Sequence, residues 1–248
     1  MIPLKDSVPR IHFPAALYAI LALNGLAFMV QMNLSHKELY ALFHVYGVIP
    51  ARFVHPEWSA WTIYPQNHLS FVTYMFLHGG WMHFLINMWT LWIFADNVED
   101  VMGGFRFAAF YLTCGLAALA THIIFNPDSV IPVMGASGAI AGVMGAYLLL
   151  YPRAKVFTLI PIIIIPYFID LPAVLFLGLW FLGQILSGLS SLGADPQAGG
   201  IAWWAHSGGF IAGMLLLPLF RNPKRCFYRF NPRTRSYQKT CPGFGRNE

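Results

Sequence analysis

The stretch Gly135–Tyr151, with the sequence GASGAIAGVMGAYLLLY, is apolar along its length and contains no charged side chain. It is long enough to cross the hydrocarbon layer of a bilayer as a helix, which needs about 17–25 predominantly apolar residues. Ser137 lies at its start, among glycine and alanine. The stretch therefore predicts a membrane-spanning helix that begins beside a serine hydroxyl.

The rest of the chain has the same character. Hydrophobic residues make up 57% of the 248 and charged residues only 10%, whereas a soluble domain carries about 25% charged residues. Five further stretches qualify as spans: Pro14–Met32, Phe71–Ala95, Phe105–Phe125, Leu171–Leu189 and Trp203–Phe220. The sequence thus predicts an all-α polytopic membrane protein, with a six-helix membrane domain over residues 14–220.

Lysine and arginine predict the orientation, because these residues are enriched in cytoplasmic loops. With six spans and the N-terminus inside, thirteen of the fifteen lie on the cytoplasmic side, and only Lys37 and Arg52 lie outside. Residues 1–13 and the basic tail 221–248 are therefore both predicted to be cytoplasmic. We interpret the tail as a topology determinant that contacts anionic lipid of the bilayer, and we expect no nucleic-acid partner.

Two connecting segments are predicted to lie at the membrane surface. The outer segment Asn33–Ser70 mixes tryptophan and tyrosine with proline, which favours short interfacial helices. The inner segment Val156–Asp170 is apolar but interrupted by Pro161 and Pro166, so it is predicted to be an interfacial turn.

The three cysteines predict neither a disulfide nor a metal site. Cys114 lies in a span, while Cys226 and Cys241 lie in the tail, where a reducing compartment would keep them as thiols. The two tail cysteines have no nearby His or Cys at zinc-ligand spacing. We expect no bound metal or cofactor.

Four polar side chains stand out inside the predicted spans: His83, Asn87, Ser137 and His206. Burying such groups without partners is costly, so each is a functional candidate. His83 lies 16 residues before Glu99, Ser137 lies 16 before Arg153, and His206 lies 15 before Arg221, each of them a charged residue near the cytoplasmic boundary. At a helical rise of about 1.5 Å per residue, all three lie roughly 23 Å above the inner boundary. Asn87 is one helical turn from His83 and lies on the same face. These depths predict one shared site just beneath the outer surface.

Glycines predict that the fourth and sixth spans pack closely. Two pairs have the spacing of four that allows transmembrane backbones to approach: Gly138 with Gly142, and Gly209 with Gly213. This packing would bring the Ser137 hydroxyl to the His206 imidazole.

The chemistry predicted for this pair is nucleophilic catalysis, with Ser137 as nucleophile and His206 as general base. His83, Asn87 and the Ser137 backbone N–H could stabilise an oxyanion. No carboxylate within the membrane is placed to orient His206, because Asp96, Glu99 and Asp100 lie at the opposite boundary. We therefore expect a dyad rather than a triad.

Three motifs carry a family resemblance: His83-x-x-x-Asn87, Gly135-Ala136-Ser137-Gly138 and Ala205-His206-x-x-Gly209-x-x-x-Gly213. With them the chain resembles the rhomboid intramembrane serine proteases of the six-span prokaryotic type. The resemblance implies a rhomboid-like bundle with an interfacial first outer loop, in a bacterial cell (inner) membrane. It also implies the site roles given above, no cofactor, and transmembrane proteins as substrates.

Further positions match or depart from the family pattern. The resemblance places His78 near a water-accessible cavity and makes Glu99 a structural glutamate. Many rhomboids have a Trp-Arg pair where this chain has Leu69-Ser70, and an aromatic residue one turn after the serine where it has Ala141. What anchors the first outer loop and what orients His206 are therefore open at this stage.

The predicted function is cleavage of peptide bonds in or next to transmembrane segments of other membrane proteins, through an acyl-enzyme. One alternative is an inactive rhomboid-like protein that binds membrane clients, which loss of Ser137 or His206 would favour, but both are present. A transporter would predict polar groups at the bilayer centre and repeat symmetry, and the sequence has neither. The oligomeric state and the physiological substrate stay open.

Overall fold

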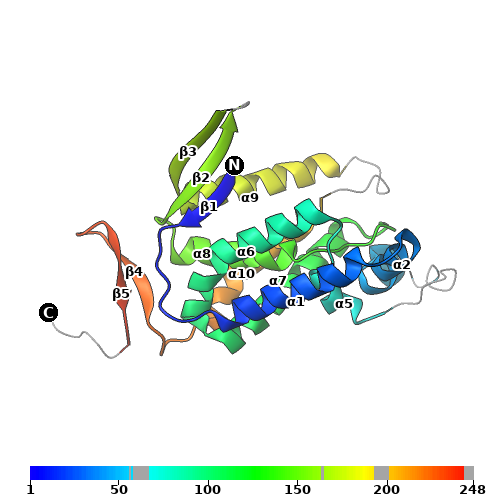
Figure 1. Ribbon diagram of the computed structural model, residues 1–248, viewed down its shortest axis with the longest axis horizontal. Coiled ribbons are helices and arrows are strands. Elements are labelled where there is room, and N and C mark those ends of the chain that lie inside the picture. The colour runs from blue at the N-terminus through cyan, green and yellow to red at the C-terminus, as the bar shows by residue number, and fades with distance from the viewer. Residues whose placement is uncertain (56, 58–66, 163–164, 193–200, 243–248) are drawn as a thin grey trace.

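The computed structural model is a bundle of helices with small sheets at one end (Figure 1), and it describes residues 1–55, 57, 67–162, 165–192 and 201–242. The long helices are α1 (Ala15–Met32), α6 (Trp81–Met102), α7 (Gly104–Phe125), α8 (Ser137–Leu150), α9 (Ala173–Ser191) and α10 (Trp203–Phe220). Among the described helices, α1, α7, α9 and α10 are long and apolar enough to cross a membrane, and α8 is apolar but shorter, at 14 residues. The protein is an integral, multi-pass membrane protein.

Helix α6 begins ten residues later than the predicted span Phe71–Ala95. The first part of that span instead forms α5 (Ser70–Thr73) and the short 3-10 helix η1 (Tyr74–Phe76), before the Gly79-Gly80 pair interrupts the helical chain. The helix also continues past Ala95 to Met102, because the acidic side chains in its last turns find partners inside the protein.

Those partners lie at the start of α1 and in the segment just before it. Glu99 accepts the backbone N–H groups of Ala16 (3.0 Å) and Leu17 (2.8 Å), and Asp100 accepts those of residues 11 and 12 at 2.5 and 2.8 Å. The first N–H groups of a helix have no partner within it and favour a nearby negative charge. Glu99 is thus a buried cap that joins α6 to α1 rather than a solvated acid.

Helix α8 lies at the centre of the bundle, and every residue from Gly138 to Tyr147 is buried. It contacts α6, α7, α9 and α10. Its contact with α10 is made by backbone: a Cβ atom added at Gly213 would overlap the carbonyl oxygen of Gly142, and one added at Gly209 would overlap that of Gly138. The close packing of these two helices through glycine is therefore present in the structure.

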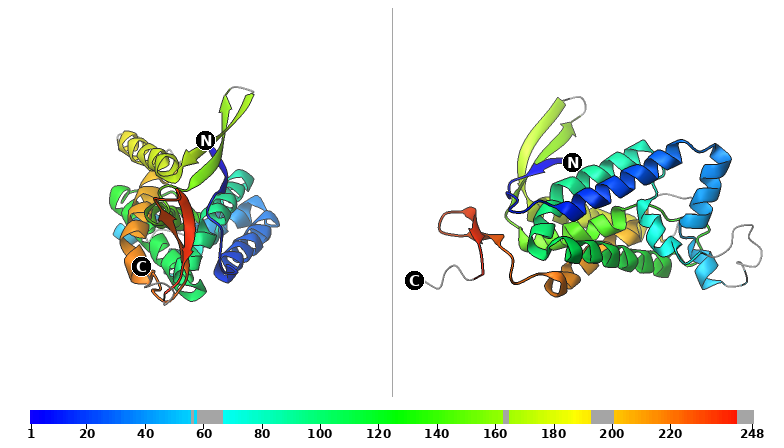
Figure 2. Two further views of the ribbon diagram at one scale, coloured as in Figure 1. Left: turned by 90° about the vertical axis from the view of Figure 1, so that its left-hand side faces the viewer. Right: turned by 60° about the horizontal axis from the view of Figure 1, so that its bottom comes forward.

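Two small antiparallel sheets are an addition to the predicted all-α fold. One has the order β1-β2-β3, from β1 (Ile2–Asp6), β2 (Lys155–Ile162) and β3 (Ile165–Pro172), and the other pairs β4 (Phe227–Asn231) with β5 (Ser236–Thr240) in the tail. Both lie toward the same end of the molecule (Figure 2).

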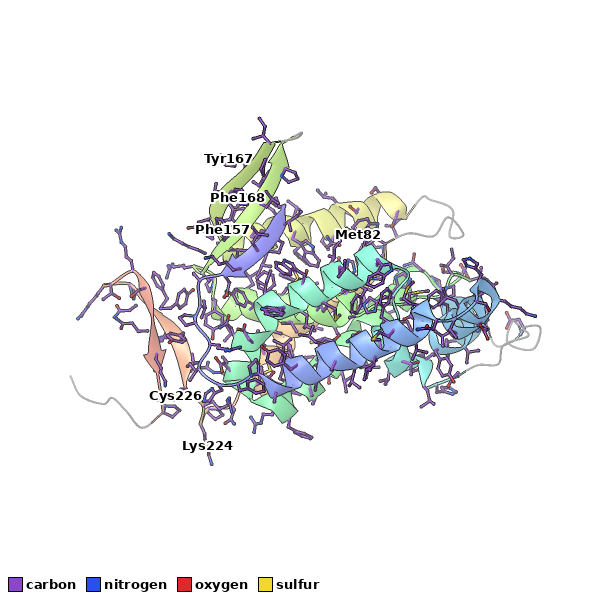
Figure 3. All side chains as sticks on the ribbon, viewed as in Figure 1. Met82, Phe157, Tyr167, Phe168, Lys224 and Cys226 are labelled. Atoms are coloured by element: carbon purple, nitrogen blue, oxygen red, sulfur yellow. A yellow bond between two sulfur atoms is a disulfide. The ribbon has the colours of Figure 1, made fainter. Side chains whose placement is uncertain are left out.

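The segment Val156–Asp170 is not the predicted turn, because its described residues, 156–162 and 165–170, lie in the paired strands β2 and β3. Its isoleucine, valine and aromatic residues favour strands, and Pro161 pairs with Pro166, so that two residues without a backbone N–H face each other. Figure 3 shows Tyr167 and Phe168 on β3, away from the helical bundle.

The prediction that the tail cysteines stay unpaired was also wrong for this structure. Phe227 pairs with Thr240, so Cys226 and Cys241 are the next opposed pair along the β4–β5 hairpin, and they form a disulfide. Figure 3 shows Cys226 at the beginning of this hairpin. Strand register, which the cysteine spacing alone does not reveal, brings the two sulfur atoms together.

The first outer segment forms α2 (His36–Tyr46) and α3 (Pro50–Val54), at the opposite end of the molecule from β4 and β5 (Figure 1). Its tryptophans and Tyr64 lie outside the described residues. A β-bridge joins Val48 to Val133 with backbone bonds of 3.1 and 2.7 Å, and Arg52 donates to the carbonyl of His44 at 2.5 Å. These contacts anchor the loop in a chain that lacks the Trp-Arg pair.

We expect Gly213→Ala to lower the free energy of unfolding by about 1–3 kcal/mol, because the added methyl group forces α10 away from α8. Thermal unfolding in detergent measures the effect. Gly178→Ala on α9 is the matched control, since a Cβ atom there meets nothing within 4 Å. Equal unfolding temperatures for the two variants would contradict the close contact.

Candidate active site

Ser137 is the first residue of α8, and the chain turns sharply just before it. Gly135 makes this turn with φ +127°, a conformation that favours glycine, and its N–H donates to the carbonyl of Tyr74 at 2.8 Å. Because Ser137 opens the helix, its own backbone N–H has no acceptor within the helix. The serine hydroxyl and a free backbone donor are thus presented together.

His206 lies in the first turn of α10 and faces this serine. Its Nε2 atom is 2.8 Å from the Ser137 Oγ, a hydrogen bond between two helices that are distant in sequence. The structure therefore brings together the two residues that depth counting placed at one level.

A third side chain completes the contact. The Gln184 Oε1 atom of α9 lies 2.8 Å from the His206 Nδ1, and the Gln184 side-chain amide donates to the carbonyl of Trp180 at 3.2 Å. The Trp180 ring lies beside the imidazole, with 5.9 Å between ring centroids. These groups from α9 hold His206 where the sequence offers only Ala141 on α8.

Sequence reasoning missed Gln184, although a signal was present. It is the only amide side chain in the apolar stretch Leu171–Leu189, and a buried amide inside a span is a functional candidate by default. Its side chain is 7% exposed.

His83 and Asn87, on α6, approach the serine from another side. A Cβ atom at Gly135 would lie 2.8 Å from the His83 Nε2, so the ring stands directly against the turn before Ser137. The Gly79 N–H donates to the His83 Nδ1 at 3.3 Å, which leaves the proton of a neutral ring on Nε2. The Asn87 Nδ2 is buried and finds no acceptor within the described parts of the chain.

All four predicted residues line one cavity of about 790 Å³, within the range of small-ligand pockets. His122 of α7, which was not among the predicted site residues, lines the cavity as well. His78 lies behind His83, with 5.2 Å between the ring centroids, and is itself 1% exposed. In the described residues, no three His, Cys, Asp or Glu side chains gather as metal ligands.

The bundle and its site define a class: a polytopic membrane protein with a half-buried serine–histidine pair among its helices. A sequence model of the rhomboid domain matches residues 65–223, which include α6 to α10 and every residue of the site described above. The chain belongs to the rhomboid family.

Several curated proteins are similar to the chain. It is 26% identical over 156 residues to the mitochondrial Rhomboid protein 1 of Saccharomyces cerevisiae, covering 61% of this chain and 42% of that protein. It is 31% identical over 119 residues to the chloroplastic Rhomboid-like protein 11 of Arabidopsis thaliana, covering 48% and 39%. The Rhomboid protease GluP of Bacillus subtilis is 38% identical over 77 residues, covering 31% and 15%. In each case the chain spans less than half of the relative's length.

Proposed function

We propose that this protein is an intramembrane serine protease that cleaves peptide bonds in or next to transmembrane segments of other membrane proteins. The observation that carries the proposal is the 2.8 Å contact between the Ser137 Oγ and the His206 Nε2, on the wall of a cavity inside the helical bundle. A serine hydroxyl is a weak nucleophile until an adjacent base takes its proton, and this contact supplies the base. Relatives that are named rhomboid proteases support the same reading.

The reaction follows from these positions. The Ser137 Oγ attacks the carbonyl carbon of the scissile peptide while its proton passes to the His206 Nε2. The tetrahedral intermediate collapses to an acyl-enzyme, and His206 gives the proton to the departing amine. Water then attacks the ester, again with His206 as base, and releases the new carboxyl end of the substrate together with the free serine. Each step uses groups of the chain, the substrate and water.

The negative charge of the intermediate needs donors that are already in place. Three groups converge on the cavity beside Ser137: its own backbone N–H, the Nε2–H of His83, and the Nδ2 of Asn87. We assign them to the oxyanion. The Asn87 amide is buried and has no acceptor in the described structure. A substrate oxygen in the cavity would give it the hydrogen bond that it lacks.

We also propose six spans within residues 14–220, in a bacterial cell membrane, with residues 1–13 and the tail 221–248 in the cytoplasm. The support is the placement of thirteen of the fifteen lysines and arginines on that side. The disulfide between Cys226 and Cys241 argues against this orientation, because disulfides persist in oxidising compartments. The state of these two cysteines in the cell therefore tests the orientation.

We expect a serine-directed fluorophosphonate to label the detergent-solubilised protein, and we expect both Ser137→Ala and His206→Ala to abolish labelling. Loss of the nucleophile removes the reacting atom, and loss of the base leaves the hydroxyl protonated. Ser207→Ala is a control, since its hydroxyl donates to the carbonyl of Trp203, 3.0 Å away. Labelling that persists in Ser137→Ala would refute the mechanism, and a wild-type protein that neither labels nor cleaves would be the inactive client-binding protein.

We expect Asn87→Ala to lower kcat for a transmembrane substrate by about 10²–10³-fold, the loss typical of one oxyanion donor. KM should change little, because the donor acts on charge that develops only in the transition state. Thr90→Ala is a suitable control, because Thr90 lines the same cavity from the same helix. A rise in KM at constant kcat would assign Asn87 to substrate binding instead.

The state of Cys226 and Cys241 in growing cells tests the proposed orientation, because a tail in the reducing cytoplasm would hold them as thiols, whereas the disulfide of the structure persists in an oxidising compartment. Alkylation with a membrane-permeant maleimide before lysis, followed by mass analysis, counts the modified cysteines. Modification of both confirms the cytoplasmic tail. A pair that is modified only after reduction would place the tail on the outer side and reverse the proposed orientation.

A further inference from the structure

A line of hydrogen bonds runs from the backbone of α9 to the serine of α8. The carbonyl of Trp180 only accepts, so the Gln184 NH₂ group must face it, at 3.2 Å. The Gln184 oxygen therefore points to the His206 Nδ1, at 2.8 Å. The His206 Nε2 then meets the Ser137 Oγ. The Trp180 carbonyl settles the orientation of the glutamine amide.

This orientation determines the tautomer of His206. An amide oxygen only accepts hydrogen bonds, so the proton of the neutral imidazole lies on Nδ1 and the Nε2 is bare. A bare Nε2 accepts the O–H of Ser137, whereas the other tautomer would direct an N–H at the oxygen and could not take its proton. The amide thus selects the only neutral form of the ring that can act as a base.

We infer that Gln184 is a positioning residue that holds His206 in its Nδ1–H form, and that the reactivity of Ser137 therefore depends on how α9 sits against α10. The inference rests on the proposed serine protease function. It assigns to α9, which carries neither reacting group, a part in the chemistry.

The packing of α9 against α10 sets the position of Gln184 relative to His206. Phe181 stacks on Phe210 of α10, with 4.6 Å between ring centroids, and Gly188 lies against the indole of Trp204. The other face of α9 is exposed and rich in leucine, including Leu179, Leu182 and Leu186. The hydrogen bond from His206 to Gln184 exists only while the aromatic contacts keep α9 in this position.

Gln184→Leu tests the assignment. It removes the acceptor and keeps a side chain of similar size, so we expect kcat and the rate of fluorophosphonate labelling to fall about threefold to tenfold, as for one hydrogen bond, with KM unchanged. Gln184→Glu should restore most of the rate, because a carboxyl group keeps an accepting oxygen in either protonation state.

The small labelling reagent separates positioning of His206 from handling of the substrate. If Gln184→Leu lowers cleavage of a transmembrane substrate but leaves the labelling rate unchanged, Gln184 contacts the substrate and the inference is wrong. Equal labelling rates for the leucine and glutamate variants, both below wild type, would also overturn it, since the acceptor would then be irrelevant.

A spectroscopic measurement needs no activity. The ¹⁵N resonances of His206, identified by their loss in His206→Ala, should show a protonated Nδ1 and a bare Nε2 in the wild type. Gln184→Leu should give a mixture of tautomers. A wild-type mixture would refute the inference even if the protein is an active protease, and the expected spectrum from an unreactive protein would refute only the proposed function.

A matched pair of glycine variants tests the dependence on α9. A Cβ atom at Gly188 would lie 3.0 Å from the Trp204 ring, so Gly188→Ala must shift α9 and Trp204 apart. A Cβ atom at Gly183 meets nothing within 4 Å, and Gly183→Ala changes the helix propensity by the same amount. We expect slower labelling only for Gly188→Ala, and equal rates in both variants would overturn the dependence.

Discussion

The contact between the backbones of α8 and α10 is the constraint on which the rest of the structure depends. Gly142 and Gly213 have no side chains, so the two helices approach until their main chains touch. The same approach brings the first turns of both helices together, and the serine and the histidine are in those turns. A bulkier pair of helices would hold the same two residues too far apart to share a proton.

The remaining helices complete a site that this pair begins. Helix α6 brings His83 and Asn87 to the cavity, and its far end is tied to α1 through Glu99. Helix α9 adds Gln184 and Trp180 on the other side of the imidazole. The polar groups around Ser137 thus come from separate helices, each held by contacts of its own.

Much of the candidate site could be predicted because residue counts along a span measure depth. That reasoning placed Ser137, His83 and His206 at one level, and the glycine spacing indicated which helices would touch. The depth of a residue in a span does not reveal the direction of its side chain around the helix axis, or which helix lies beside it. The partner of the His206 Nδ1 on α9 was therefore not identified.

The departures from the predicted fold concern interactions that hydropathy does not record. The extension of α6 past Ala95 depends on buried carboxylates that cap another helix, whereas charged residues are ordinarily taken to mark the end of a span. The β2–β3 hairpin and the tail disulfide depend on strand register, which brings together residues far apart in the chain. In each case a long-range pairing outweighs the local pattern.

The order of the site residues along the chain has a consequence for synthesis. Ser137, Gln184 and His206 lie on three successive helices, and the base is on the last of these. A nascent chain that has inserted α8 and α9 still carries an unactivated alcohol. Under the proposed mechanism, the protein gains its reactivity only when α10 enters the bundle, so an incomplete chain cannot cut its neighbours in the membrane.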